Sequence, residues 1–95
     1  MRERDEERFL IQQVKKSGGL CLKFVSPGMD GVPDRLCLFP GGKMKFVEVK
    51  APGEKPRALQ LARHNQLEKM GFPVAVIDLK EQVEDLLQSM EVMKC

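Results

Sequence analysis

Asp34, Glu48 and Lys50 combine the residue types and the spacing needed for metal-dependent cleavage of a phosphodiester bond. The segment 36–49 is expected to form a β-hairpin closed by a turn at 40–42, because a Pro-Gly-Gly run separates two apolar stretches. Asp34 and Glu48 would then lie at the start of one strand and the end of its neighbour. Both carboxylates would meet at one end of the sheet, where a divalent cation could take an oxygen from each.

The strand that carries Glu48 places Lys50 beside that carboxylate. Side chains alternate along a strand, so Glu48 and Lys50 project from one face and Val49 projects from the other. Apolar residues flank Glu48, and the strand is expected at the centre of the sheet. Charged groups on such a strand are costly unless they have partners, and a shared cation would supply one.

Each of these motifs has an ordinary structural explanation when it is taken alone. Pro33 and Asp34 are typical of a turn, in which proline presets the backbone and aspartate accepts bonds from local amides. An acid and a base two residues apart on a strand commonly form a solvated face. The convergence of both motifs at one end of a sheet favours the catalytic interpretation.

The elements that must position these residues can be predicted from periodicity and from the breakers Gly and Pro. Helices are expected at 3–17, 56–70 and 80–93, and strands at 20–25, 35–39, 44–50 and 73–78. The first three strands should form an antiparallel meander, and the last two should pair in parallel across the connecting helix. The expected fold class is α/β: a small mixed sheet flanked by helices, in one domain spanning residues 1–95.

Composition limits the classes of function. Of the 95 residues, 42% are hydrophobic and 32% are charged, which is ordinary for a globular domain, and the net charge is only +2. The positive charge is concentrated, because the segment 43–69 holds seven Lys or Arg and three acids. Cys21, Cys37 and Cys95 form neither a metal-binding clip nor a disulfide framework, which suits a reducing cytoplasm. With no signal peptide and no long apolar run, a cytoplasmic protein without a membrane segment is expected, in a bacterial cell or a phage-infected host.

These features together resemble the PD-(D/E)XK nuclease superfamily and, within it, the VRR-NUC family in its minimal stand-alone form from phages and bacteria. The resemblance extends from about Arg2 to Asp78 and is carried by Gly31-Val32-Pro33-Asp34, by Glu48-Val49-Lys50, by a glutamate in the first helix and by a glutamine in the second. It implies an αβββαβ core. It also implies Mg²⁺ or Mn²⁺ bound by Asp34, Glu48 and the carbonyl of Val49, with Lys50 as the catalytic lysine.

The resemblance implies supporting roles for two further residues. Glu7 matches the glutamate of the first helix and would assist the metal or position water, with Glu3 as the alternative on the same side of the helix and a plain surface acid as the ordinary explanation. Gln60 matches the family's glutamine. Gln66 falls more centrally within the apolar arc formed by Leu59, Ala62 and Met70, so a buried and satisfied Gln66 is the competing interpretation.

Basic residues around the site are expected to contact phosphate, although a solvated surface residue is an alternative for each one. The candidates are Lys23, Arg35, Lys55, Arg57, Arg63 and the single histidine, His64. Such contacts position nucleic acid without reading its sequence. All five aromatic residues are Phe, which argues against a stacking platform for single strands and favours duplex or branched DNA.

The expected function is therefore that of a Mg²⁺-dependent, structure-selective endodeoxyribonuclease in replication and repair, with four-way (Holliday) junctions as a candidate substrate. A homodimer is expected, because the apolar stripe of the last helix continues to Val92 and Met93 and because the resemblance points the same way. Two sites related by a two-fold axis could cut two strands symmetrically. Two alternatives remain: a non-catalytic module that binds branched DNA within a repair assembly, and a structural domain whose acids and lysine form an ion-pair cluster.

Overall fold

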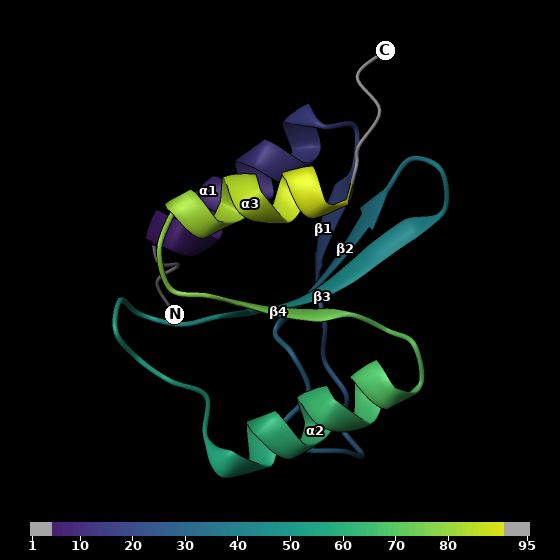
Figure 1. Ribbon diagram of the computed structural model, residues 1–95, viewed down its shortest axis with the longest axis vertical. Helices are drawn as coiled ribbons and strands as arrows, with labels where there is room; N and C mark the ends of the chain where they lie inside the picture. The colour runs from purple at the N-terminus through teal and green to yellow at the C-terminus, as the bar shows by residue number, and fades with distance from the viewer. Residues whose placement is uncertain (1–4, 91–95) are drawn as a thin grey trace.

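The computed structural model describes residues 5–90, which form three helices and four strands (Figure 1). The order is α1 (Asp5–Lys16), β1 (Leu20–Lys23), β2 (Arg35–Phe39), β3 (Lys43–Val49), α2 (Ala58–Lys69), β4 (Val74–Ile77) and α3 (Glu81–Ser89). This is the predicted order, and the α/β class is confirmed. The first strand ends at Lys23 rather than Val25, since the chain turns into the long loop that leads to Asp34.

The four strands form one mixed sheet in the order β1-β2-β3-β4. The pairs β1–β2 and β2–β3 are antiparallel, and β3–β4 is parallel, as the sequence predicts. The turn 40–42 closes the hairpin, and its two glycines, Gly41 and Gly42, adopt the positive φ angles of 87° and 77° that favour glycine in a tight turn. Strand β3 therefore lies in the interior of the sheet, hydrogen-bonded on both sides.

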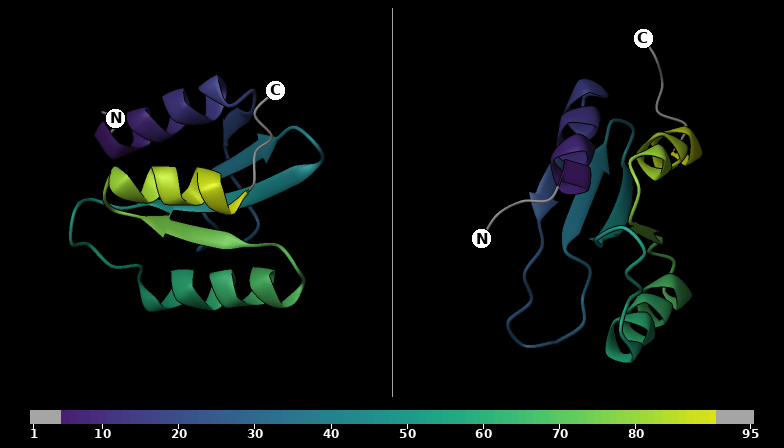
Figure 2. Two further views of the ribbon diagram at one scale, coloured as in Figure 1. Left: turned by 45° about the horizontal axis from the view of Figure 1, so that its top comes forward. Right: turned by 90° about the vertical axis from the view of Figure 1, so that its left-hand side faces the viewer.

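The helices cover the two faces of the sheet unequally. Helices α1 and α3 lie side by side over one face, and α2 lies on the other (Figures 1 and 2). The hydrophobic core fills the space beneath α1 and α3. It contains Leu10 and Val14 from α1, and from the remaining elements Cys37, Phe39, Val47, Val49, Ile77, Val83, Leu86 and Met90. Burial of each large aliphatic side chain contributes about 1.5–3 kcal/mol.

Helix α2 differs from the prediction made for it. Its leucines at 59 and 61 are each 49% exposed and Met70 is 60% exposed, so the predicted inward-facing apolar arc is wrong. The buried residues of the helix are two polar ones, Gln60 and His64. Hydrophobic periodicity could not reveal this orientation, because α2 covers the polar end of β3 rather than the core.

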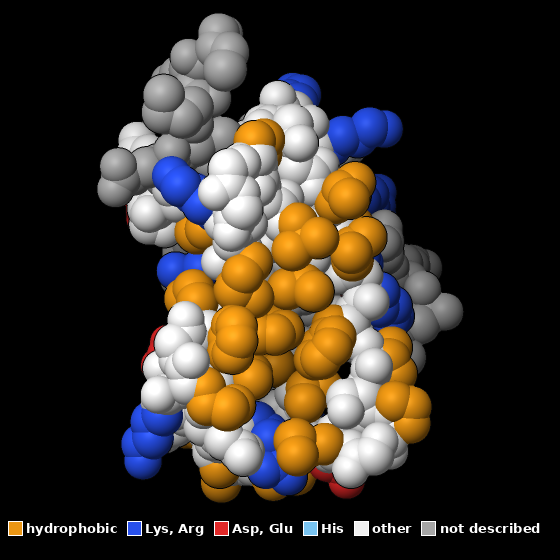
Figure 3. All heavy atoms as spheres, turned by 90° about the vertical axis from the view of Figure 1, so that its right-hand side faces the viewer, with side chains coloured by type: hydrophobic (Ala, Val, Ile, Leu, Met, Phe, Trp, Pro, Cys, Tyr) orange, Lys and Arg blue, Asp and Glu red, His pale blue; other side chains and the backbone are white. Residues whose placement is uncertain are grey.

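Beyond the reach of α2, the same face of the sheet is open. The side chains that alternate onto it from the first three strands are all apolar: Leu20, Leu22, Leu36, Leu38, Met44 and Phe46. Leu20, Leu22 and Leu38 are 58%, 43% and 36% exposed. Apolar side chains gather over a broad area on one side of the molecule (Figure 3). Phe46 is buried and packs against Phe24, so we refer to the other five residues as the open sheet face.

Helix α3 uses its apolar stripe within the molecule. Val83, Leu86 and Met90 are buried in the core, so this part of the stripe does not offer the surface on which a homodimer was predicted; Val92 and Met93 lie outside the described residues. None of the helices within residues 5–90 combines the length and the apolar character needed to cross a membrane.

The join between α1 and β1 depends on Gly19. A Cβ atom at this position would lie 2.4 Å from the carbonyl oxygen of Leu38 and 3.1 Å from Val14 Cγ1. We predict that Gly19→Ala lowers the free energy of unfolding by about 1–3 kcal/mol, because backbone and core must move to admit the methyl group. Urea denaturation measures this change. Gly28→Ala is the matched control, since no atom lies within 4 Å of its Cβ position, and it should shift stability by less than about 1 kcal/mol.

Candidate active site

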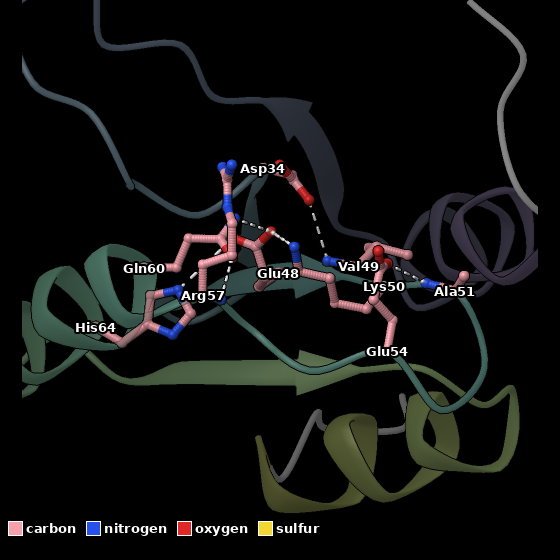
Figure 4. Close-up of polar contacts among 9 residues, drawn as sticks. All are labelled: Asp34, Glu48, Val49, Lys50, Ala51, Glu54, Arg57, Gln60 and His64. Atoms are coloured by element: carbon pink, nitrogen blue, oxygen red, sulfur yellow. Dashed lines mark hydrogen bonds and ion pairs between the residues drawn. The ribbon is translucent and has the colours of Figure 1, made fainter.

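Asp34 and Glu48 face each other across neighbouring antiparallel strands. Arg35 pairs with Val47 in antiparallel register, so the preceding residue, Asp34, stands opposite Glu48. The hydrogen bond from the Phe24 amide to the Asp34 carbonyl shows that the sheet geometry continues to Asp34. Directly opposed side chains on one face have Cβ atoms about 4.5–5.5 Å apart. The Asp34 carboxylate also accepts a hydrogen bond from the Val49 amide, with Oδ2 at 3.2 Å (Figure 4). The predicted carboxylate pair is therefore brought together.

Three polar groups surround the Glu48 carboxylate, which is 1% exposed. Gln60 donates from Nε2 to Glu48 Oε2 at 3.2 Å, and Lys50 Nζ lies 3.7 Å from the same oxygen. His64 Nε2 lies 3.6 Å from the other oxygen, Oε1 (Figure 4). The acid thus has an amide and an amine on one oxygen and an imidazole near the other.

The electrostatics of Glu48 indicate that positive charge is needed beside it. Burial, the largest cause, and the negative charge of Asp34 together raise the pKa of the Glu48 carboxyl from 4.5 to about 7, while Lys50 acts in the opposite direction. Burial lowers the pKa of His64, which favours a neutral imidazole. Lys50 alone therefore does not offset the cost of two facing carboxylates.

Gln60, rather than Gln66, is the glutamine that contacts Glu48. Its side chain bridges two elements, because Oε1 accepts the Arg57 amide at 2.8 Å at the start of α2 while Nε2 reaches Glu48. Gln66 is exposed, and its Oε1 accepts a hydrogen bond from Arg63 Nη1 at 3.1 Å. The competing interpretation of a buried Gln66 is wrong, for the same reason that the apolar arc of α2 is wrong.

Glu7 lies on the other side of the sheet from the two carboxylates. Its Oε2 accepts a hydrogen bond from Arg35 Nε at 2.8 Å. Arg35 alternates with Asp34 along β2 and therefore points toward the face covered by α1 and α3. The structure thus places Glu7 against Arg35 rather than beside Asp34 and Glu48. The alternative, Glu3, lies outside the described residues.

Two of the predicted phosphate contacts need correction. Arg35 is 8% exposed and paired with Glu7, and His64 is 5% exposed and faces Glu48, so neither is presented to a ligand at the surface. Arg35 is buried because its side chain points beneath α1 and α3, and His64 is buried because its side of α2 faces the sheet. The partnership of His64 with Glu48 was missed from the sequence, although its position one helical turn after Gln60 places it on the same side of α2.

The remaining predicted cations are accessible. Lys23, Lys55 and Arg57 are exposed, and Arg57 begins the helix that carries Gln60. Arg63 is partly exposed, and its Nε donates to the Asp30 carbonyl at 2.8 Å, which ties α2 to the loop before Asp34. Three exposed cations and one partly engaged arginine therefore remain for phosphate.

The donor set fits a hard divalent cation. Glu48 Oε1 is buried and has no hydrogen-bond partner, and the two carboxylates supply the oxygen donors that Mg²⁺ prefers. Within residues 5–90 no three or more His, Cys, Asp or Glu side chains cluster as a complete metal cage. Mg²⁺ does not require one, because it usually keeps several waters and takes only one or two carboxylates. Asp34, Glu48 and the Val49 carbonyl would hold it.

The raised pKa of Glu48 makes the metal-free protein sensitive to pH. Between pH 4.5 and about 7 the unfolded chain releases the Glu48 proton and the folded chain retains it, so stability falls as pH rises through this window. We predict a loss of up to about 3 kcal/mol between pH 4.5 and 7.5 in EDTA. Denaturant unfolding across this range should show that Glu48→Gln removes most of the loss, whereas the surface variant Glu81→Gln keeps it. Equal slopes for the two variants would contradict this assignment.

Comparisons with known proteins agree with this geometry. No family model matches the chain. A protein of Acyrthosiphon pisum secondary endosymbiont phage 1, named "Putative nuclease p44", is 51% identical over 81 residues, which are 85% of this chain and 87% of that protein. A solved structure described as "VRR_NUC domain" superposes with a TM-score of 0.82 at 33% identity, covering 87% of this chain and 90% of that one. The chain therefore belongs to the VRR-NUC family of nucleases.

Proposed function

We propose that this nuclease is a Mg²⁺- or Mn²⁺-dependent endodeoxyribonuclease that selects branched DNA, including four-way junctions, and works as a homodimer in replication or repair. The observation that carries the catalytic part is the buried Glu48 carboxylate, which faces Asp34 and has Lys50 Nζ at 3.7 Å. Two opposed acids, of which Glu48 is buried and has a raised pKa, favour a bound cation, and the neighbouring ammonium group suits a phosphodiester substrate. The phage relative supports action in the cytoplasm of a bacterial cell or infected host.

A bound Mg²⁺ would lower the pKa of a coordinated water and neutralise charge on the phosphate. Lys50 lies at the end of β3, where its ammonium group can hold the attacking water and stabilise the negative charge that develops on the phosphate oxygens. Gln60 and His64 keep the Glu48 carboxylate in one orientation from α2. The Asp34 carboxylate accepts a hydrogen bond from the backbone amide of Val49, which fixes the end of the strand.

Glu7 is assigned a supporting role that acts through Arg35. The Glu7–Arg35 ion pair is mostly buried, with side chains 17% and 10% exposed, and it ties α1 to the first residue of β2. Asp34 directly precedes that residue. Truncating one partner of a buried pair leaves an uncompensated charge, so the pair fixes the strand start that presents Asp34.

The exposed cations Lys23, Lys55 and Arg57 are assigned to the DNA backbone. Lys55 lies in the β3–α2 connection and Arg57 at the start of α2, whereas Lys23 ends the edge strand β1 and projects from the same face as Arg35. Contacts of this kind orient a duplex without reading its sequence. Selectivity for branched DNA would then come from the shape of the substrate and from the spacing of two sites.

Removing the Lys50 ammonium group should slow cleavage strongly while leaving the fold intact. We predict that Lys50→Ala lowers the cleavage rate by about 10²–10⁴-fold, because charge stabilisation and water positioning are both lost. Wild type and variant are incubated with plasmid, linear duplex, flap and four-way junction DNA in Mg²⁺, Mn²⁺ or EDTA. Lys69→Ala, an exposed lysine at the end of α2, is the matched control and should cut at the wild-type rate.

The outcomes separate the alternatives. Cleavage by Lys50→Ala at the wild-type rate would refute the proposed mechanism. Binding of junctions by the wild type without cleavage under any metal would favour the non-catalytic branched-DNA module. Neither binding nor cleavage would favour a structural domain.

The open sheet face is the surface that supports a homodimer. Its five side chains carry no charge, so it is unsuited to DNA, and it is broad and apolar as interface cores are. A second copy brings the same apolar surface, which is the requirement for a two-fold, self-complementary interface. This face replaces the end of α3 as the proposed interface.

A charge on the open sheet face should dissociate the dimer. We predict that Leu22→Glu yields monomers by analytical ultracentrifugation, because a carboxylate would be buried without a partner. Leu79→Glu is the control: Leu79 is 46% exposed, close to the 43% of Leu22, and lies between β4 and α3. A monomeric wild type, or equal dimerisation of both variants, would overturn this interface.

A further inference from the structure

Two cysteines stand directly opposite each other on β1 and β2. Cys21 pairs with Cys37 in the strand register, and the two sulfur atoms lie 3.6 Å apart. The bond from the Phe24 amide to the Asp34 carbonyl identifies that pair as hydrogen-bonded, and the pair types alternate along the ladder. Cys21–Cys37 is therefore a non-hydrogen-bonded pair.

This pair type brings the strands closest together at the position of the thiols. Non-hydrogen-bonded partners have Cα atoms about 4.5 Å apart. Disulfides span Cα separations of about 4.4–6.8 Å. A disulfide between Cys21 and Cys37 could therefore form with little movement of either strand, because mainly the two sulfur atoms must approach each other.

The two thiols are not equivalent. Cys37 is fully buried in the core, whereas Cys21 is partly exposed at the edge of the sheet. Cys37 donates its thiol proton to Cys21 Sγ. This hydrogen bond, together with burial, raises the pKa of Cys37 well above its ordinary value. The arrangement makes Cys21 the accessible nucleophile and Cys37 the protected resolving thiol.

We propose that Cys21 and Cys37 form an oxidisable dithiol that hydrogen peroxide converts to a cross-strand disulfide. The Cys21 thiolate attacks one peroxide oxygen, the O–O bond breaks, and the second oxygen leaves as water after protonation, so that Cys21 becomes a sulfenic acid. Cys37 then attacks the Cys21 sulfur, loses its proton and expels the hydroxyl group as a second water. Two thiols are oxidised and one peroxide is reduced to two waters.

A Cys21–Cys37 disulfide would constrain the segment of the chain that contains Asp34. It closes the segment between residues 21 and 37, which holds the whole β1–β2 connection, and it lies on the same face as Arg35. Constraining this segment reduces the conformational freedom of the unfolded chain. In a reducing compartment such a bond is transient, as for redox-sensing dithiols.

The experiment uses the full chain with Cys95→Ser, which removes the third thiol without changing a described residue. The protein is treated with hydrogen peroxide, quenched, and examined by intact mass and by peptide mapping without reductant. We expect a mass loss equal to two hydrogen atoms, a peptide joining Cys21 to Cys37, and complete reversal by dithiothreitol. The oxidised form should also melt at a higher temperature than the reduced form.

Two further variants test the asymmetry of the pair. In Cys95→Ser/Cys37→Ala, peroxide should leave Cys21 as a sulfenic acid that a dimedone probe traps. In Cys95→Ser/Cys21→Ala, the buried Cys37 should resist both peroxide and maleimide while the protein is folded. The proposal is overturned if folded Cys95→Ser accumulates sulfenic or sulfinic acid without a disulfide, or forms the link only in denaturant.

Discussion

Burial of one carboxylate on an interior strand determines much of this structure. Glu48 lies between two hydrogen-bonded neighbours, under a helix and opposite a second acid, in a position where an uncompensated charge is expensive. The protein surrounds it with an amide, an ammonium group and an imidazole and still leaves one oxygen without a hydrogen bond. Helix α2 supplies two of those groups, Gln60 and His64, from the side of the helix that faces Glu48. A buried carboxylate oxygen to which no protein group donates a hydrogen bond is well suited to bind a cation.

The two faces of the sheet carry different kinds of side chain as a result of this constraint. Residues that alternate toward α1 and α3 are apolar and form the core, with the Glu7–Arg35 pair at its edge. Residues that alternate the other way form the site near α2 and an uncovered apolar surface farther along β1 to β3. The chain therefore places its hydrophobic core on one face of the sheet and the candidate site, together with an uncovered apolar surface, on the other.

The sequence predicts the order of elements, the strand pairing and the convergence of Asp34, Glu48 and Lys50. These features depend on local signals: breakers, alternation and the Pro-Asp and Glu-Val-Lys spacings. It does not predict the orientation of α2. Leu59 and Met70 resemble a core stripe, yet Gln60 and His64 face inward, because the surface beneath the helix is a carboxylate rather than a hydrophobic layer. Similarly, Arg35 resembles a surface cation until the register shows that its side chain points beneath α1, where Glu7 receives it. Such partnerships arise from three-dimensional packing, for which linear spacing carries little signal.

The strict alternation along β3 also limits how this family member can vary in length. Val47 and Val49 enter the core while Glu48 and Lys50 enter the site, so inserting or deleting one residue within the strand would exchange the two sets. Valines would then line the catalytic end and charges would enter the hydrophobic layer. The turn at 40–42 carries no such restriction, because it lies outside the strand pairing and its two glycines have open space around their Cβ positions. Length changes in this hairpin are therefore expected only at its tip.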